Sequence, residues 1–353
     1  MTTIPAASQG SSGSEPTPAG GTPVDAGGAG PPGHPARPAA DRDSGGAPAG
    51  PPRRKGALAL PLGLLKAMRP RQWVKNVLVL AAPFAAGRLF APAVLPDVAL
   101  AFVAFSLAAS GVYLVNDTRD VAADRAHPTK RHRPIAAGVV PPAVAVTVAV
   151  VLFAGALVLA ALTAPSLAIV LAVYVVVQLA YCVWLKHEPV IDICIVSSGF
   201  LMRAIAGGAA AAVALSPWFL LTMAFGSLFM ASGKRYAEMR LAERTGAKIR
   251  KSLERYSASY LRFVWSLSAT VVIMAYGLWA FNIGATPDRP PSTWAIVSIV
   301  PFVVAILRYA VDVDGGNGGE PEEIVLRDRV LQVLGAAWVV ILVVAVYLPR
   351  LLQ

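Results

Sequence analysis

Long apolar runs constrain this 353-residue chain more than any other feature of its sequence. Nine stretches of roughly 18–24 residues are long enough to cross a ~30 Å hydrocarbon core as helices. Charged residues make up only 14% of the chain, against about 25% in soluble domains. The sequence therefore predicts an all-α polytopic membrane protein. The nine predicted spans are approximately 73–91, 97–115, 137–161, 165–185, 190–212, 216–234, 260–283, 292–311 and 330–349.

The first 56 residues differ from the rest of the chain in composition. Between Ala6 and Arg54 they are rich in Gly, Pro, Ala and Ser and contain almost no large apolar side chain. Such a segment buries too little surface to offset the entropy lost on ordering. We therefore expect residues 1–56 to be a disordered tail and residues 57–353 to be the transmembrane domain.

Lys and Arg residues are distributed unequally over the two sides that these spans define. One side contains most of them, including eight between residues 234 and 255, whereas the other has only Arg88, Arg289 and Arg350. Because Lys and Arg accumulate in cytoplasmic loops, we expect a multi-pass plasma-membrane protein with a cytoplasmic amino terminus and active site. The net charge of +11 suits phosphate groups better than nucleic acid, since the charges lie in short loops between apolar runs.

An acidic segment follows the second predicted span. Asn116, Asp120 and Asp124 recur every four residues, so a continuous helix would present them on one face, with Asp117 beside them. Carboxylates on one stripe repel each other, and Mg²⁺ favours a few oxygen ligands that leave room for substrate phosphates. A solvated loop would need no such acidic stripe. We therefore predict all four residues as Mg²⁺ ligands and the three aspartates as catalytic.

Basic residues come directly after the acidic segment. Arginine binds phosphate oxygens through paired N–H groups, and lysine binds them as a point charge. Such groups can hold phosphate oxygens that the metal does not reach. We therefore predict that a diphosphate substrate binds to Arg125, Lys130, Arg131 and Arg133.

The pattern N-D-x-x-D-x-x-x-D from Asn116 to Asp124, followed by Arg133-Pro134, resembles the first aspartate-rich motif of the UbiA superfamily of intramembrane prenyltransferases. The resemblance covers roughly residues 60–350. It implies a bundle of transmembrane helices around a central cavity. It also implies that Mg²⁺ and the donor diphosphate bind at this motif.

The sequence departs from the family pattern after the sixth predicted span. Most members have a second motif, D-x-x-x-D, whereas the predicted loop Gly233–Glu243 contains no Asp. Together with Arg69–Asn76, this departure resembles a branch that transfers 5-phosphoribosyl from phosphoribosyl diphosphate to decaprenyl or another polyprenyl phosphate, for arabinan-containing (arabinogalactan) cell walls. Since that donor has a second phosphate, the resemblance implies donor contacts from Lys234, Arg235, Tyr236 and Glu238.

Charged residues in and beside the other spans complete the predicted site. Asp192 and Arg203 are about three helical turns apart and so share a face of the fifth span; a structural ion pair between them is the alternative. Lys186 and Asp192 match family positions near the donor. We predict that the lipid phosphate is bound by Lys75, Asn76 and Arg203, with an interfacial anchor as the alternative role of Lys75.

Two other functions stay open at this point. A conventional family member would use a polyprenyl diphosphate and an aromatic acceptor, and would normally need the missing second Asp motif. A transporter of a phosphorylated metabolite would also use a basic cavity, but the sequence has no convincing internal repeat of the kind common in transporters. The sequence leaves open whether the protein is a homo-oligomer.

Overall fold

The computed structural model describes residues 58–246, 253–283, 292–315 and 321–351. The chain divides into two units, residues 1–53 and 54–353, and all the described residues belong to the second. The predicted tail, residues 1–56, therefore lies outside the described residues. Within the described ranges every regular element is a helix, so the all-α prediction is confirmed.

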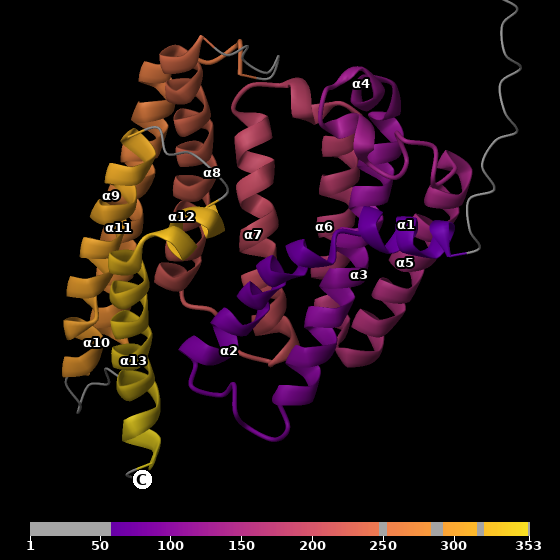
Figure 1. Ribbon diagram of the computed structural model, residues 1–353. Helices are drawn as coiled ribbons and strands as arrows, with labels where there is room; N and C mark the ends of the chain where they lie inside the picture. The colour runs from indigo at the N-terminus through magenta and orange to yellow at the C-terminus, as the bar shows by residue number, and fades with distance from the viewer. Residues whose placement is uncertain (1–57, 247–252, 284–291, 316–320, 352–353) are drawn as a thin grey trace, which may run out of the picture. The chain divides into compact units, whose positions relative to one another are not determined.

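Figure 1 shows α3, α5 and α6 on one side of the second unit, α8, α9, α11 and α13 on the other, and α7 between them. Helix α7 packs against both α6 and α8. The elements in chain order are α1 (Ala59–Ala67), the 3-10 helix η1 (Pro70–Leu80), α2 (Ala81–Ala85), α3 (Leu95–Arg119), α4 (Val121–Ala126), η2 (Lys130–His132), α5 (Pro142–Thr163), α6 (Pro165–Val183), η3 (Leu185–His187), α7 (Ile191–Ala210), α8 (Pro217–Thr245), α9 (Ala258–Asn282), α10 (Thr293–Val297), α11 (Ile299–Asp314), α12 (Pro321–Arg327) and α13 (Arg329–Leu351).

Seven helical segments in the described part of the chain are long and apolar enough to cross a membrane. They are α3, α5, α6, α7, α9, α10 together with α11, and α13. Large apolar side chains such as Val151, Leu162 and Val176 are exposed on them, as a lipid-facing surface requires. The chain is a multi-pass membrane protein. The other two predicted spans, 73–91 and 216–234, correspond to η1 with α2 and to the first part of α8, so the number nine stays a prediction.

Helix α8 extends well beyond the predicted span 216–234. Ser216 caps its amino end by accepting a hydrogen bond from the backbone N–H of Phe219 at 3.1 Å. It ends at Gly246, whose φ of 66° is the left-handed conformation that closes many helices. The segment Gly233–Glu243, predicted to be a loop, is therefore helical.

The first predicted span is also not one regular helix, because most of it is the 3-10 helix η1. A 3-10 helix has three residues per turn, so Trp73, Asn76 and Val79 lie in one row. Trp73 Nε1 donates to Ser110 Oγ at 3.0 Å, and Asn76 Nδ2 donates to Ser106 Oγ at 2.9 Å. These hydrogen bonds therefore hold η1 against α3 at Ser106 and Ser110.

The two largest groups of buried apolar side chains among the described residues lie on either side of α7. One lies mainly between α3, α6 and α7 and includes Phe105 and Tyr174. The other lies between α8, α9 and α11, where the Phe229 ring is 5.7 Å from Trp265 and 5.5 Å from Tyr309. The charged residues predicted for function lie mostly at or near the ends of these same helices, so the two cores fix the positions of the groups described next.

Candidate active site

The acidic segment forms the junction between α3 and α4. Asp117 and Asp124 are both 2% exposed. Arg133 Nη1 donates to Asp117 Oδ1 at 3.2 Å and to Asp124 Oδ2 at 2.8 Å. Arg69 Nη2 donates to Asp117 Oδ1 at 2.6 Å. Two buried carboxylates from successive helices therefore converge on one guanidinium group.

The continuous helix predicted through Asn116, Asp120 and Asp124 is interrupted, because α3 ends before Asp120 and the chain bends there (φ −89°, ψ 5°). The two residues that share a cation are instead Asp117 and Asp124. Asp120 accepts a hydrogen bond from Lys186 Nζ in η3. Asn116 is half-buried beside them. The bend thus separates the acidic residues into a buried pair and one that faces η3.

The donor chemistry of this junction fits a divalent cation. No group of three or more His, Cys, Asp or Glu side chains in the described part of the chain is arranged so that it could hold a metal ion by itself. Mg²⁺, however, is commonly held by one or two carboxylates, with waters and substrate phosphates as its other ligands. Asp117 and Asp124 already share a single cationic nitrogen of Arg133. The pair therefore provides oxygen ligands directed at a common positive group.

The four basic residues predicted at the diphosphate lie in different surroundings. Of these four, Arg133 alone forms a hydrogen bond or ion pair with Asp117 or Asp124 in the described part of the chain. Arg125 Nε donates to the backbone oxygen of Ala136 at 3.1 Å, and this bond connects α4 to the turn that precedes α5. Arg131 is exposed, and Lys130 is half-buried. Arg133 is therefore the member of this set that the structure brings to the carboxylates.

A second charged group lies at the start of α7. Asp192 is 2% exposed, and its Oδ1 accepts a hydrogen bond from the Tyr256 hydroxyl. Its Oδ2 lies 3.5 Å from Arg235 Nη2, and Arg235 Nη1 lies 3.8 Å from Glu238 Oε2. The Tyr256 oxygen also accepts the backbone N–H of Val190 at 2.5 Å. Burial and the bond to Asp192 raise the pKa of Tyr256, so this hydroxyl stays protonated and donates.

Helix α8 thus brings Arg235 to Asp192 and Glu238 to Arg235, and half-buried Lys234 precedes them on the same helix. Tyr236 has different surroundings. Its ring stacks on Trp265 with the centroids 5.4 Å apart, and its hydroxyl donates to Asp314 Oδ1 at 2.8 Å. The contacts of Tyr236 therefore join α8 to α9 and α11 rather than to Asp192.

Arg203 does not pair with Asp192. The buried guanidinium donates from Nε to Asn76 Oδ1 at 2.6 Å, from Nη1 to the backbone oxygen of Gly199 at 2.6 Å, and from Nη2 to the Tyr174 hydroxyl at 3.3 Å. Arg203 therefore joins α7 to η1 and α6. The three residues predicted at the lipid phosphate lie close together, since Lys75 precedes Asn76 in η1.

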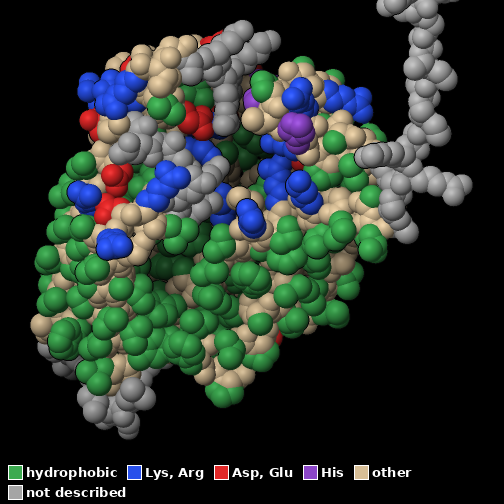
Figure 2. Space-filling view, viewed as in Figure 1, with side chains coloured by type: hydrophobic (Ala, Val, Ile, Leu, Met, Phe, Trp, Pro, Cys, Tyr) green, Lys and Arg blue, Asp and Glu red, His purple; other side chains and the backbone are tan. Residues whose placement is uncertain are grey.

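Basic side chains from these groups gather on one part of the surface. Figure 2 shows Lys and Arg around a hollow in the molecule, with a broad surface of hydrophobic side chains beside them. This distribution of charge is typical of a site at the edge of a membrane.

Residues 77–326 match the sequence model of the UbiA prenyltransferase family. The chain belongs to this family. The decaprenyl-phosphate phosphoribosyltransferase of Mycolicibacterium smegmatis is 61% identical over 308 residues, which are 85% of this chain and 95% of that protein. The protein of the same name from Mycobacterium tuberculosis is 64% identical over 281 residues, covering 78% of this chain and 92% of its own.

Solved structures support the UbiA fold. A UbiA homologue from Archaeoglobus fulgidus bound to GPP and Mg²⁺ aligns with a TM-score of 0.59 at 15% identity. The alignment covers 79% of this chain and 96% of that structure. The resemblance inferred from the first aspartate-rich motif is thus confirmed at the level of family and fold.

Arg69 and Tyr256 of this UbiA-family protein contact predicted site residues, but the sequence did not predict either of them as a site residue. Arg69 has a φ of 54°, a left-handed conformation that is uncommon outside glycine, and its guanidinium carbon lies 4.6 Å from the centre of the Tyr113 ring. Pro70 was the available sequence signal for an unusual backbone at Arg69, because a residue before proline is disfavoured in the α-helical region. No comparable signal links Tyr256 to Asp192, which is 64 positions away.

We expect Tyr256→Phe to lower the free energy of unfolding by about 1–3 kcal/mol, because it leaves a buried carboxylate oxygen and the Val190 N–H without their partner. The measurement is the thermal unfolding midpoint in detergent. Tyr260→Phe is the matched control, since the two rings stack with centroids 5.9 Å apart and the Tyr260 hydroxyl has no hydrogen bond to the described residues. Equal midpoints for the two variants would contradict the role of the Tyr256 hydroxyl.

Proposed function

We propose that this UbiA-family protein transfers the 5-phosphoribosyl group of 5-phosphoribosyl 1-diphosphate to decaprenyl phosphate and releases diphosphate, in the synthesis of an arabinan cell-wall precursor. The observation that carries the proposal is the basic character of α8, where Arg235 lies beside Asp192 and the usual second Asp motif is missing. A donor with a second phosphate needs cations at that position. Relatives above 60% identity that bear the matching name support the same reaction.

The acidic junction is the proposed binding site of the donor diphosphate. Asn116, Asp117, Asp120 and Asp124 would hold Mg²⁺, which when bound neutralises the charge of the departing diphosphate. Arg133 has N–H groups beyond the nitrogen that contacts the carboxylates, and these can bind phosphate oxygens. Lys186 can do the same from the other side of Asp120. The surrounding basic residues Arg125, Lys130 and Arg131 add positive potential.

The second charged group is the proposed site for the phosphoribosyl end of the donor. Lys234 and Arg235 would bind the phosphate on ribose C5 through charge-assisted hydrogen bonds. Glu238 can accept hydrogen bonds from the ribose hydroxyls. Asp192 holds Arg235 in place. The donor contact of Tyr236 stays a prediction, and its hydroxyl donates to Asp314 in the structure.

In the transfer, the bond between ribose C1 and the diphosphate oxygen breaks, and its electron pair leaves with diphosphate. An oxygen of the lipid phosphate then bonds to C1. Anionic groups around C1 stabilise the positive charge that develops there. The lipid phosphate is already ionised at neutral pH, so the step needs no general base. Lys75 is the proposed contact of that phosphate, supported by Asn76 and Arg203 behind it.

The charge distribution supports a cytoplasmic active site in the plasma membrane. The junction of α3 with α4, the turn η3 and the second half of α8 contain most of the basic residues discussed above, and such residues accumulate on the cytoplasmic side. A soluble sugar diphosphate would reach the hollow from that side, while the isoprenoid chain stays in the bilayer. The proposal requires no partner protein.

The test is a turnover assay with purified protein, radiolabelled 5-phosphoribosyl 1-diphosphate, decaprenyl phosphate and Mg²⁺. We expect a labelled lipid whose mass equals the acceptor plus one phosphoribosyl group. EDTA should abolish its formation, and excess Mg²⁺ should restore it. A prenylated aromatic product made from a polyprenyl diphosphate would support a conventional family member instead. Uptake of labelled donor into vesicles without any labelled lipid would indicate a transporter.

A further inference from the structure

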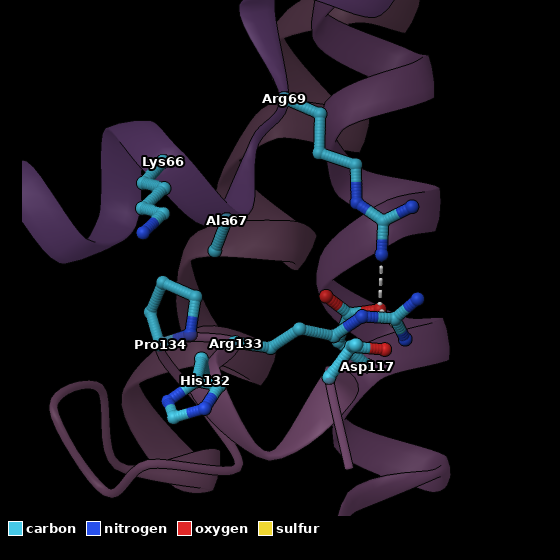
Figure 3. A pocket seen from close by; sticks show the side chains of 8 residues that line it. Lys66, Ala67, Arg69, Asp117, His132, Arg133 and Pro134 are labelled. Carbon is cyan, nitrogen blue, oxygen red and sulfur yellow. Dashed lines mark hydrogen bonds and ion pairs between the residues drawn. The ribbon is translucent and has the colours of Figure 1, made fainter. Parts of the chain in front are cut away.

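A pocket of about 260 Å³ lies on the α1 side of the acidic junction (Figure 3). It opens between α1, the end of α3 and the segment around η2. Six of its residues take no part in the reaction proposed above: Lys66, Ala67, Arg69, Thr129, His132 and Pro134. The rest of its lining is formed by Asp117 and Arg133.

The lining of the pocket is cationic. Lys66, Arg69 and Arg133 contribute three positive charges, against one carboxylate, that of Asp117. Among the described residues, Arg69 contacts that carboxylate through Nη2 only, so its other N–H groups remain available. Arg133 contacts the carboxylate through Nη1, and its other N–H groups are the ones proposed above to bind the donor diphosphate. Lys66 is exposed and forms no ion pair with the described residues. These donors suit a phosphate group.

Helix α1 places this pocket at an apolar surface. Leu58, Leu62 and Leu65 are 71%, 61% and 50% exposed, whereas Gly63 and Ala67 are buried against the bundle. In Figure 1 α1 lies across α3 and α5 instead of parallel to them. A short helix with exposed leucines and a basic residue beside them is typical of the membrane interface. A helix at that interface would hold the ammonium group of Lys66 near the level of the lipid headgroups.

We propose that the pocket beside α1 is a phosphate-ester subsite at which a lipid phosphate docks before transfer. The inference rests on the proposed function, and it shares no residue with the contact proposed at Lys75, Asn76 and Arg203. All three nitrogens of Arg203 are already engaged in the protein, whereas the pocket has uncommitted donors. The same chemistry would also accept a phosphate of the soluble donor, and the exposed leucines of α1 favour the lipid.

The test is the steady-state kinetics of Lys66→Gln, which removes the charge and nearly preserves the length. We expect the KM for decaprenyl phosphate to rise about tenfold, as for the loss of a charged hydrogen bond, with kcat and the KM for the sugar donor unchanged. Lys66→Arg should restore the KM. Arg71→Gln is the matched control, because Arg71 is an exposed cation in the neighbouring η1 that does not line the pocket.

A rise in the KM for the sugar donor alone would show that the pocket binds a phosphate of the soluble donor and not the lipid phosphate. Unchanged KM values for both substrates would overturn the proposal. Equilibrium binding of decaprenyl phosphate and of decaprenol to protein in nanodiscs provides a readout without turnover. Wild type should prefer the phosphorylated lipid, and Lys66→Gln should lose much of that preference. If transfer is absent but this preference is present, the proposed function fails and the subsite stands.

Discussion

Asp120→Asn is expected to lower kcat for phosphoribosyl transfer by about 10²–10³-fold, the range for loss of one group that stabilises charge in a transition state. The variant should remain folded, because Asp120 is 30% exposed and its partner Lys186 is 17% exposed. Ion pairs near the surface contribute only about 0–1 kcal/mol. The measurement is the rate of labelled-lipid formation at saturating substrates, with the thermal unfolding midpoint as a check on folding.

Asp97→Asn is the matched control for this prediction. Asp97 lies in the first turn of α3, at the end opposite the acidic junction. The same loss of one carboxylate charge there should leave kcat unchanged. An Asp120→Asn variant that turns over as fast as Asp97→Asn would remove Asp120 from the active site. Asp117 and Asp124 are less suitable, because both are buried partners of Arg133 and their loss would also disturb packing.

Gly207→Ala is expected to have the largest effect on stability, a loss of about 3 kcal/mol. A Cβ atom on Gly207 would lie 1.8 Å from the backbone oxygen of Val79 and 2.8 Å from its carbonyl carbon. Since the obstacle is backbone, η1 would have to move away from α7. That shift would also break the bond between Arg203 and Asn76. Both a lower unfolding midpoint in detergent and a loss of turnover are therefore expected.

Gly277→Ala in α9 controls for the substitution itself. Outside the adjacent backbone of its own helix, no atom of the described residues lies within 4 Å of a Cβ built on Gly277. Alanine is the better helix former by about 0.5–1 kcal/mol, so this variant should be as stable as the wild type or slightly more stable. If Gly207→Ala and Gly277→Ala unfold at the same temperature, then η1 does not pack on α7 as closely as described.

Periodicity and charge in the sequence were enough to predict the helical class and most of the long helices. Apolar runs depend on local composition, so spans such as 142–163 and 165–183 were close to their predicted limits. The motif from Asn116 to Asp124 was enough to predict the family. Both signals are local in the sequence, and for that reason neither required knowledge of how distant segments pack.

The contacts that link distant segments could not be predicted in the same way. The bend at Asp120 gives Asp117 and Asp124 a shared partner, Arg133, where an unbroken helix would have presented a different set. The left-handed backbone at Arg69 depends on packing against α3. The spacing of Trp73, Asn76 and Val79 by three residues was a usable signal for η1, but it lay within a run long enough to suggest a membrane span.

The most direct measurement is an anomalous-scattering map from crystals of the protein grown with Mn²⁺ and 5-phosphoribosyl 1-diphosphate. We expect a peak about 2 Å from carboxylate oxygens at the α3–α4 junction, contributed by Asp117, Asp120 or Asp124, with the diphosphate bound to the same ion. A well-defined donor bound elsewhere, or a peak distant from these three carboxylates, would contradict a metal-assisted site at this junction.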